Sequence, residues 1–129
     1  MPRSEAEKRN HALVMGLFEE VLNPLDSSAV DRFIASDYIQ HSRLAEPGRD
    51  GLKAFLDWAK SANPSAVHDI KRSFVEDDHV TVHYHVRRTP NDPGLAVIDI
   101  FRIENGLIAE HWDVLQEIPL EGPNPNPIF

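Results

Sequence analysis

The sequence predicts an α+β fold in which helices pack on one face of a curved antiparallel sheet. Two observations predict this class. Apolar residues recur with a period of about 3.6 before Pro64, and they alternate with a period of 2 after it. The turns between the alternating segments are short, which favours strands joined by hairpins. We expect such a sheet to form a half-open cone, with a pocket between its inner face and the helices.

The composition is that of a single globular domain spanning residues 1–129. Of these residues 41% are hydrophobic and 26% are charged, and the net charge of −8 argues against nucleic acid or an anionic membrane as a partner. The absence of cysteine excludes disulfides, thiol nucleophiles and thiolate metal sites. Because no apolar run has the length of a signal-peptide core or a membrane span, we expect a cytoplasmic protein.

Three helices are expected in the first half of the chain, at residues 4–22, about 27–34 and about 49–62. Ser4 and Glu7 have the spacing of a capping box, which predicts the start of the first helix. Each helix is followed by a helix-breaking asparagine or proline, or by a polar segment.

Four strands are expected in the second half of the chain. The alternating segments are residues 66–75, 79–88, 95–103 and 107–116. Clusters of turn-forming residues separate these segments. A meander of four neighbouring strands follows from this order.

Ionisable residues interrupt the last predicted hairpin, "VIDIFRIENGLIAEHWDVLQ" (residues 97–116). Asp99 lies within an apolar run, and His111 and Asp113 lie within the strand that returns. Because side chains alternate between the two faces of a strand, these three residues can share the inner face of the sheet. They are therefore candidates for a functional site.

The turn of this hairpin decides which residues lie opposite one another. A two-residue loop at residues 105–106 would place Asp99 opposite Trp112, on the other face from His111. A three-residue loop at residues 104–106 would place Asp99 directly opposite His111. We favour the three-residue loop because it gathers the ionisable residues into one cluster.

Two segments of the chain resemble a known family. "YIQHSRLAEPGRDGLKAFLDW" (residues 38–58) and "VIDIFRIENGLIAEHWD" (residues 97–113) are similar to the SnoaL-like polyketide cyclases, and more closely to the predicted SnoaL-like aldol-condensation enzymes. The resemblance covers nearly the whole chain. It implies the cone-shaped fold of the nuclear transport factor 2-like superfamily, with three N-terminal helices packed on a curved antiparallel sheet of about four main strands.

The resemblance also implies roles for four ionisable residues. Ketosteroid isomerase, another member of this superfamily, has a carboxylic-acid hydrogen-bond donor where Asp99 falls, and its general base lies approximately where His41 falls. An imidazole replaces the carboxylate of that base and the first helix lacks the isomerase tyrosine, so steroid isomerisation is not expected. SnoaL-like cyclases are thought to use an aspartate base near a histidine, and Asp99, His111 and Asp113 supply these residue types.

The resulting hypothesis is a lyase or isomerase of the aldol-condensation or cyclase type, acting without a cofactor on a small carbonyl or polyketide-like ligand. His41 or Asp99 would remove a proton next to the carbonyl, the Asp99–His111 pair would stabilise the enolate oxygen, and Asp113 would hold an imidazole in one tautomer. The alternative is a non-catalytic module of the same fold that binds a ligand or mediates oligomerisation. The expected pocket residues are Phe18, Tyr38, Phe55, Tyr84, Val97, Phe101 and Leu115.

No metal site is expected. The four candidate catalytic residues have ligand types that a metal tolerates, but they lack the helical spacing of known metal motifs. His83 and His85 alternate with apolar residues, so we expect them on the outer face of the sheet, away from the pocket.

Two further expectations concern surfaces. Ile98 and Ile100 point to the outer face, so we expect a homodimer through that face, which a monomeric mass in light scattering would contradict. The proline-rich tail ends in Ile128 and Phe129, which we expect to pack over the pocket or over a neighbouring subunit.

Overall fold

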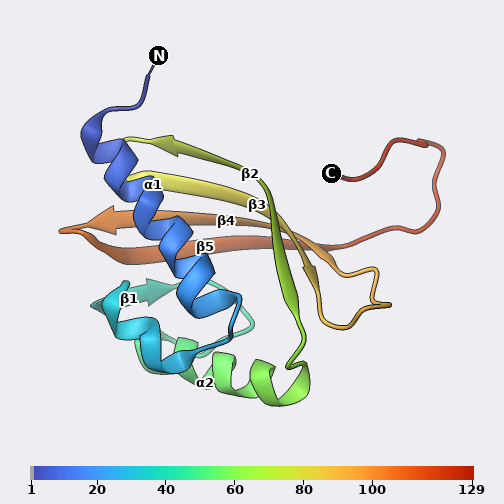
Figure 1. Ribbon diagram of the computed structural model, residues 1–129, viewed down its shortest axis with the longest axis horizontal. Helices are drawn as coiled ribbons and strands as arrows, with labels where there is room; N and C mark the ends of the chain where they lie inside the picture. Colours follow the sequence, from blue (N-terminus) through green and yellow to red (C-terminus); the bar gives the residue numbers. More distant parts are fainter. Residues whose placement is uncertain (1) are drawn as a thin grey trace.

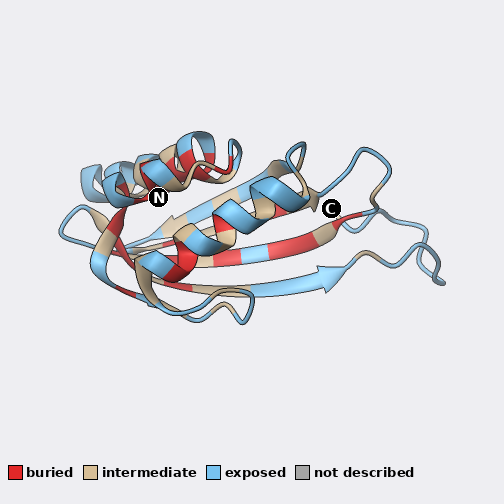
Figure 2. Cartoon of the chain, turned by 90° about the horizontal axis from the view of Figure 1, so that it is seen from below, coloured by how far each residue is buried: buried red, intermediate tan, exposed pale blue. Residues whose placement is uncertain are grey.

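A five-stranded sheet, covered on one face by helices, forms the body of the molecule (Figures 1 and 2). The computed structural model describes residues 2–129, and the strand order is β1-β5-β4-β3-β2. The elements are α1 (Glu5–Leu17), a π-helical turn η1 (Phe18–Leu22), a 3₁₀ helix η2 (Ser27–Arg32), β1 (Ile34–Gln40), α2 (Gly48–Ala62), β2 (Val67–Glu76), β3 (His79–Arg87), β4 (Leu95–Glu104) and β5 (Leu107–Glu117). The predicted α+β class is confirmed, with five strands in place of about four.

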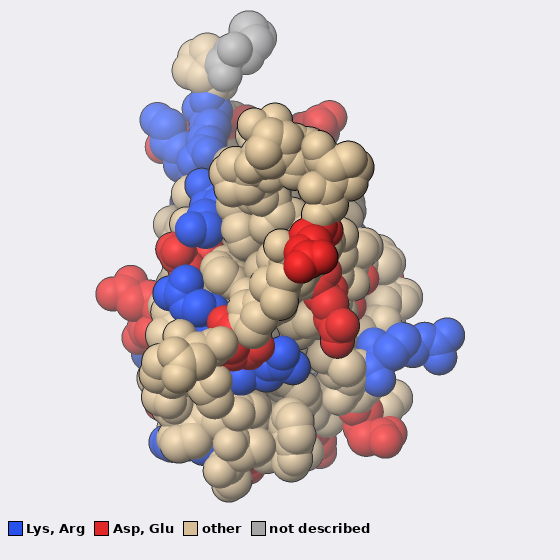
Figure 3. Space-filling view, turned by 90° about the vertical axis from the view of Figure 1, so that its right-hand side faces the viewer, with Lys and Arg blue, Asp and Glu red and all other residues tan. Residues whose placement is uncertain are grey.

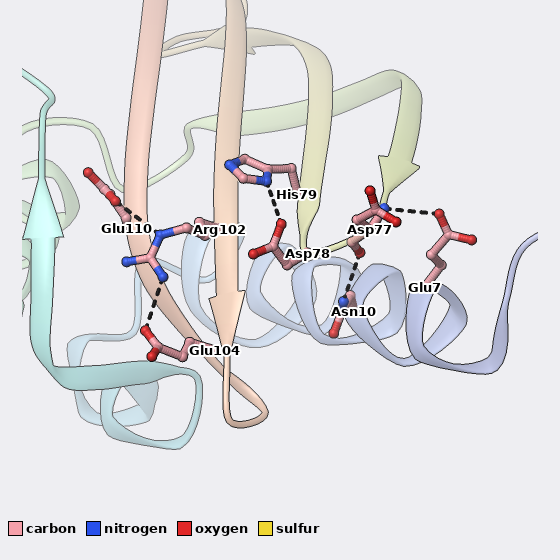
Figure 4. Close-up of polar contacts among 8 residues, drawn as sticks. All are labelled: Glu7, Asn10, Asp77, Asp78, His79, Arg102, Glu104 and Glu110. Carbon is pink, nitrogen blue, oxygen red and sulfur yellow. Dashed lines mark hydrogen bonds and ion pairs between the residues drawn. The ribbon is translucent and has the colours of Figure 1, made fainter.

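The start of α1 is the predicted capping box. The Ser4 side chain accepts from the Glu7 backbone N–H, and the Glu7 carboxylate accepts from the Ser4 backbone N–H. The same carboxylate also accepts from the backbone N–H of Asp77, and the Asn10 amide donates to the Asp77 carbonyl (Figure 4). The cap therefore anchors α1 to the turn between β2 and β3.

The first strand, β1, was not predicted. Residues 34–40 were expected to follow a helix, but they form a parallel strand against β5. The buried residues of β1 are Ile34 and Tyr38, whose spacing of four is also typical of a helix. A parallel partner more than 60 residues away leaves no local signal, so periodicity alone could not identify this strand.

The predicted register of the β4–β5 hairpin is wrong. Residues 105 and 106 both have positive φ, 53° and 76°, and form a two-residue turn. A bulge then makes Ala109 an extra residue, because Ile103 pairs with Ile108 whereas Arg102 pairs with Glu110. Asp99 therefore lies opposite Asp113, and the bulge returns the ionisable residues to one face.

The hydrophobic core lies between the helices and the inner face of the sheet (Figure 2). Val14 and Phe18 contribute to it from the first helical segment, and Val80 and Val82 contribute from β3. On α2, Leu52 and Leu56 are buried while Trp58 is exposed, which is the amphipathic pattern expected of a covering helix. The core thus fills one end of the cone and leaves space under α2.

The C-terminal tail packs against the outer face of its own sheet. The Phe129 ring centroid lies 5.2 Å from that of His83 and 4.9 Å from that of His85, and the Lys71 Nζ lies 5.3 Å from the same centroid. The prediction that this residue covers the pocket is therefore wrong, and its packing against a neighbouring subunit stays a prediction. The outward direction predicted for His83 and His85 is confirmed.

Apolar side chains remain exposed on the outer face of the sheet. Ile98 and Val114 pair across β4 and β5 and are both exposed. The homodimer through this face stays a prediction. On the face shown in Figure 3, cationic side chains are interspersed with anionic ones. None of the helices within residues 2–129 has the length and apolar character needed to span a bilayer.

Candidate functional site

A cavity of about 610 Å³ lies between α2 and the inner face of the sheet. Apolar and aromatic side chains predominate in its wall, as in most small-molecule sites. Six of the seven predicted pocket residues line it: Tyr38, Phe55, Tyr84, Val97, Phe101 and Leu115. The volume is sufficient for a ligand of several rings.

The seventh predicted pocket residue, Phe18, lies behind the cavity wall. Its ring contacts Tyr84 and Phe101 edge to face, with centroid distances of 5.0 Å and 6.2 Å. Phe18 therefore supports two lining residues from the core side.

Three of the four predicted catalytic residues come together in the cavity wall. Asp99 on β4 and His111 and Asp113 on β5 each place one polar atom within 4.8 Å of the others. The first two are buried, with 3% and 8% of their surface exposed, whereas Asp113 is partly exposed. The alternation of side chains brings them to one face, and the bulge sets their relative positions.

Gln40 fixes the tautomer of His111. Its Oε1 accepts a hydrogen bond from the Ser42 backbone N–H, which identifies this atom as the oxygen of the amide. The same oxygen lies 2.7 Å from the His111 Nδ1, so Nδ1 must carry a proton. We expected Asp113 to hold an imidazole in one tautomer, but here the Nδ1–H of His111 donates to the Gln40 oxygen.

Asp99 and His111 face each other in close contact. The His111 Nε2 lies 3.0 Å from the Asp99 Oδ1. Nδ1 is already protonated, so an unprotonated Nε2 would direct its lone pair at an ionised carboxylate, and the two would repel each other. Either Nε2 or the carboxylate must therefore hold a proton. The two atoms are within ion-pair distance, but no group within residues 2–129 makes a hydrogen bond with the buried Nε2. An N–H at this position can therefore donate to another acceptor.

The surroundings favour the charged imidazole. Burial lowers the pKa of His111, but the charge and hydrogen-bonding capacity of Asp99, together with the charge of Asp113, outweigh burial and raise that pKa above its ordinary value. These carboxylates therefore favour the imidazolium form of His111 over the neutral ring.

Two tyrosines supply neutral hydroxyl groups to the site. Tyr84 Oη donates to the Asp99 Oδ2 at 2.8 Å. Burial, and then the charge of Asp99, raise the pKa of Tyr84 and of Tyr38 far above the ordinary range. Both phenols therefore stay protonated and can act only as neutral hydrogen-bonding groups.

His41, the fourth predicted catalytic residue, lies apart from this cluster. Its Nε2 lies 2.6 Å from the Glu110 Oε2, and its ring stacks on Trp112 at a centroid distance of 5.1 Å. Those partners alternate with His111 along β5, so they belong to the outer face. The structure does not bring His41 into the cavity wall with Asp99 and His111.

Several polar residues of the cavity wall were not identified from the sequence, among them Gln40 and His68. Gln40 was missed because β1 was not recognised; alternation with Tyr38 along that strand would have placed both on the inner face. His68 lies on β2 and also lines the cavity. Its position in the alternating segment 66–75 was a signal that could have been used.

The cluster also has the residue types of a metal site. Asp99, His111 and Asp113 offer two carboxylates and one imidazole. Gln40 accepts a hydrogen bond from the His111 Nδ1, as the partners of metal-bound histidines often do. A shared proton accounts for the same close contact between Asp99 and His111 without an ion. The absence of a metal from the function stays a prediction.

The raised pKa of His111 predicts a pH-dependent stability. The unfolded chain releases this proton near pH 6.5, and the folded chain retains it to higher pH. The stabilisation is therefore complete below about pH 6.5 and is lost as the pH rises through the folded pKa. We expect the melting temperature to fall as the pH rises above about 6.5, and to fall less in His111→Gln. Equal slopes of melting temperature against pH in the two proteins would contradict this assignment.

Comparisons with known proteins agree with this geometry. The family described as SnoaL-like polyketide cyclase matches residues 12–122. No curated protein is significantly similar to the chain in sequence.

Solved structures share the fold at low sequence identity. A protein from Jannaschia sp. CCS1 classed as a SnoaL-like polyketide cyclase is 19% identical, with a TM-score of 0.75 over 89% of this chain and 90% of that one. A protein from Sinorhizobium meliloti classed as a polyketide cyclase is 24% identical, with a TM-score of 0.68 over 80% and 94%. An NTF2-like protein of unknown function from Mesorhizobium loti is 16% identical, with a TM-score of 0.70 over 89% and 97%.

These likenesses show the fold, and the family match adds the sequence pattern that runs from α1 beyond β5. Since that match spans most of the 129 residues and includes every strand, the chain belongs to the SnoaL-like polyketide cyclase family.

Proposed function

We propose that the protein catalyses an aldol-type condensation or cyclisation of a carbonyl compound, by acid–base chemistry and without a cofactor. The observation that supports this most is the Asp99–His111 pair, whose Oδ1 and Nε2 atoms lie 3.0 Å apart at the wall of a mostly apolar cavity. A carboxylate and an imidazolium side by side can accept a proton from carbon and stabilise the oxygen anion that results.

Asp99 is the base in this proposal. Its carboxylate is buried, so little water competes for its lone pairs, and Tyr84 fixes its orientation through a hydrogen bond. The acidic proton of the substrate, on the carbon next to a carbonyl group, passes to Asp99. The electron pair of that C–H bond moves into the carbonyl group and forms an enolate.

His111 and Tyr38 stabilise the enolate oxygen. The Nε2–H of His111 is not aligned with Asp99, so it can donate to a ligand oxygen in the cavity. The Tyr38 hydroxyl is a neutral donor held nearby by the wall of the cavity. Asp113 contributes a negative charge that helps keep His111 protonated.

The carbon–carbon bond forms when the enolate carbon attacks a second carbonyl carbon. The oxygen of that second carbonyl becomes an alkoxide and takes a proton from His111, which recovers one from Asp99. The base is then free again, and no oxidant or reductant is consumed. Loss of water from the aldol product would complete a condensation.

The cavity favours an apolar substrate with several oxygen atoms. Aromatic and aliphatic side chains line most of its wall, while Asp99, His111 and Asp113 gather on β4 and β5. Such a wall excludes water from the enolate and holds an extended or partly cyclised chain in one conformation. A polyketide-like ligand has this chemistry.

Proton exchange at carbon tests the proposal without the natural substrate. Cyclic 1,3-diketones and 2-acetylcyclohexanone in D₂O should exchange their acidic C–H proton faster with the protein than with buffer, by about 100-fold or more. The exchange should saturate with ketone and be inhibited by phenols, which imitate an enolate. Phenol binding without any acceleration of exchange would instead favour a non-catalytic ligand-binding module.

A further inference from the structure

His68 is a partly buried imidazole that the proposed chemistry does not use. It lies on β2, lines the cavity, and has its ring centroid 5.9 Å from that of Tyr84. Its Nδ1 is buried, and no hydrogen bond from residues 2–129 satisfies it. Buried polar atoms are almost always paired, so an unpaired one in a cavity wall calls for an explanation.

The ring is neutral at physiological pH. Burial lowers the pKa of His68, and the charge of Asp99 opposes this without reversing it. A neutral imidazole carries one N–H and one lone pair. It can therefore donate one hydrogen bond and accept another.

The strand order places His68 beside the catalytic cluster. On the inner face of the sheet, His68 on β2 is followed by Tyr84 on β3 and by Asp99 on β4. The Tyr84 ring contacts the His68 ring at one side, and its hydroxyl contacts the Asp99 carboxylate. A ligand that reacts at Asp99 and extends across Tyr84 reaches His68.

We propose that His68 is a second polar anchor of the cavity and that it recognises a hydroxyl group of the ligand. A hydroxyl both donates and accepts, so it matches a neutral imidazole in either tautomer. This inference rests on the proposed function and narrows it. The substrate is a carbonyl compound with an enolic or phenolic hydroxyl about one ring away from the carbon that loses its proton.

A series of four ligands measures this contact. The probes are 2-naphthol, whose hydroxyl imitates the enolate oxygen, and a set of dihydroxynaphthalenes (1,6-, 1,7- and 2,7-) that add a second hydroxyl at different positions. In the wild-type protein the best dihydroxynaphthalene should bind about tenfold more tightly than 2-naphthol in calorimetric titrations, the effect of one good hydrogen bond.

Three variants assign that advantage to a residue. In His68→Leu, 2-naphthol should bind within about twofold of wild type, and the tenfold preference should fall to nearly one. Asp99→Asn removes the charge that helps keep His111 protonated, so all naphthols should bind more weakly to it and the preference should persist. His79→Leu is the matched control, because His79 is half-exposed and stacks on Trp112, and it should behave as wild type.

Stability gives an independent readout. His68→Leu replaces an unpaired polar ring by an apolar side chain, so we expect its melting temperature to rise by about 3 °C. If His68 served only to stabilise the fold, the His68→Leu substitution would lower the melting temperature instead.

The outcomes separate the two proposals. Equal preferences in wild type and His68→Leu, with binding that depends on Asp99, would overturn the role of His68 alone. Failure of every naphthol to bind, or binding that does not depend on Asp99, would overturn the proposed function and this inference with it.

Discussion

Asp99→Asn is expected to lower the rate of enzyme-catalysed C–H exchange by about 10³-fold, within the range attributed to a positioned base. The amide has the shape of the carboxylate and can still accept the Tyr84 hydrogen bond, but it cannot take a proton from carbon. Asp99→Ala should be equally inactive. Deuterium exchange of a 1,3-diketone, followed by NMR in D₂O, measures both variants.

The contrast between these two variants identifies the role of Asp99. If its carboxyl group only donated a hydrogen bond to the enolate, asparagine would retain much of the activity and alanine would lose it. That result would move the base to Asp113, which lies opposite Asp99 on β5. His41→Gln is the control, because the His41 ring lies on Trp112 outside the cavity wall, and it should retain activity within about twofold.

The inner-face cluster could be predicted because it follows from alternation. His111 and Asp113 are two residues apart, so alternation places both on one face of their strand. Asp99 interrupts an apolar strand, and a buried carboxylate there is costly enough to indicate a role. The register could not be predicted. A bulge at Ala109 adds one residue to β5, and nothing in that residue distinguishes it from its neighbours.

The positions of Gln40 and His41 depended on an element that local patterns do not reveal. Once β1 is paired with β5, alternation places Gln40 beside His111 and carries the chain out of the sheet at the next residue. The parallel pairing joins residues about 70 positions apart. Because residues 34–40 were not predicted as a strand, His41 was assigned to the pocket. For the same reason Gln40, which fixes the His111 tautomer, was not identified.

The fold places aromatic packing directly behind the catalytic groups. Phe101 stacks on His111 with a centroid distance of 4.9 Å, and Tyr84 hydrogen-bonds Asp99. Phe18 contacts both aromatic rings from the core side. Tyr84 and Phe101 therefore belong both to the hydrophobic core and to the wall of the site.

Phe18→Ala should consequently lower the free energy of unfolding by about 3–5 kcal/mol, the usual cost of deleting a buried aromatic ring. Only 1% of Phe18 is exposed, and its removal leaves Tyr84 and Phe101 without their edge contacts. A typical domain has about 5–15 kcal/mol of stability, so the variant should unfold at much lower urea concentration. Phe74→Ala is the matched control: its ring is 62% exposed on β2, and its effect should stay within about 0.5 kcal/mol. Equal denaturation midpoints for the two variants would show that the ring of Phe18 does not hold the wall of the cavity in place.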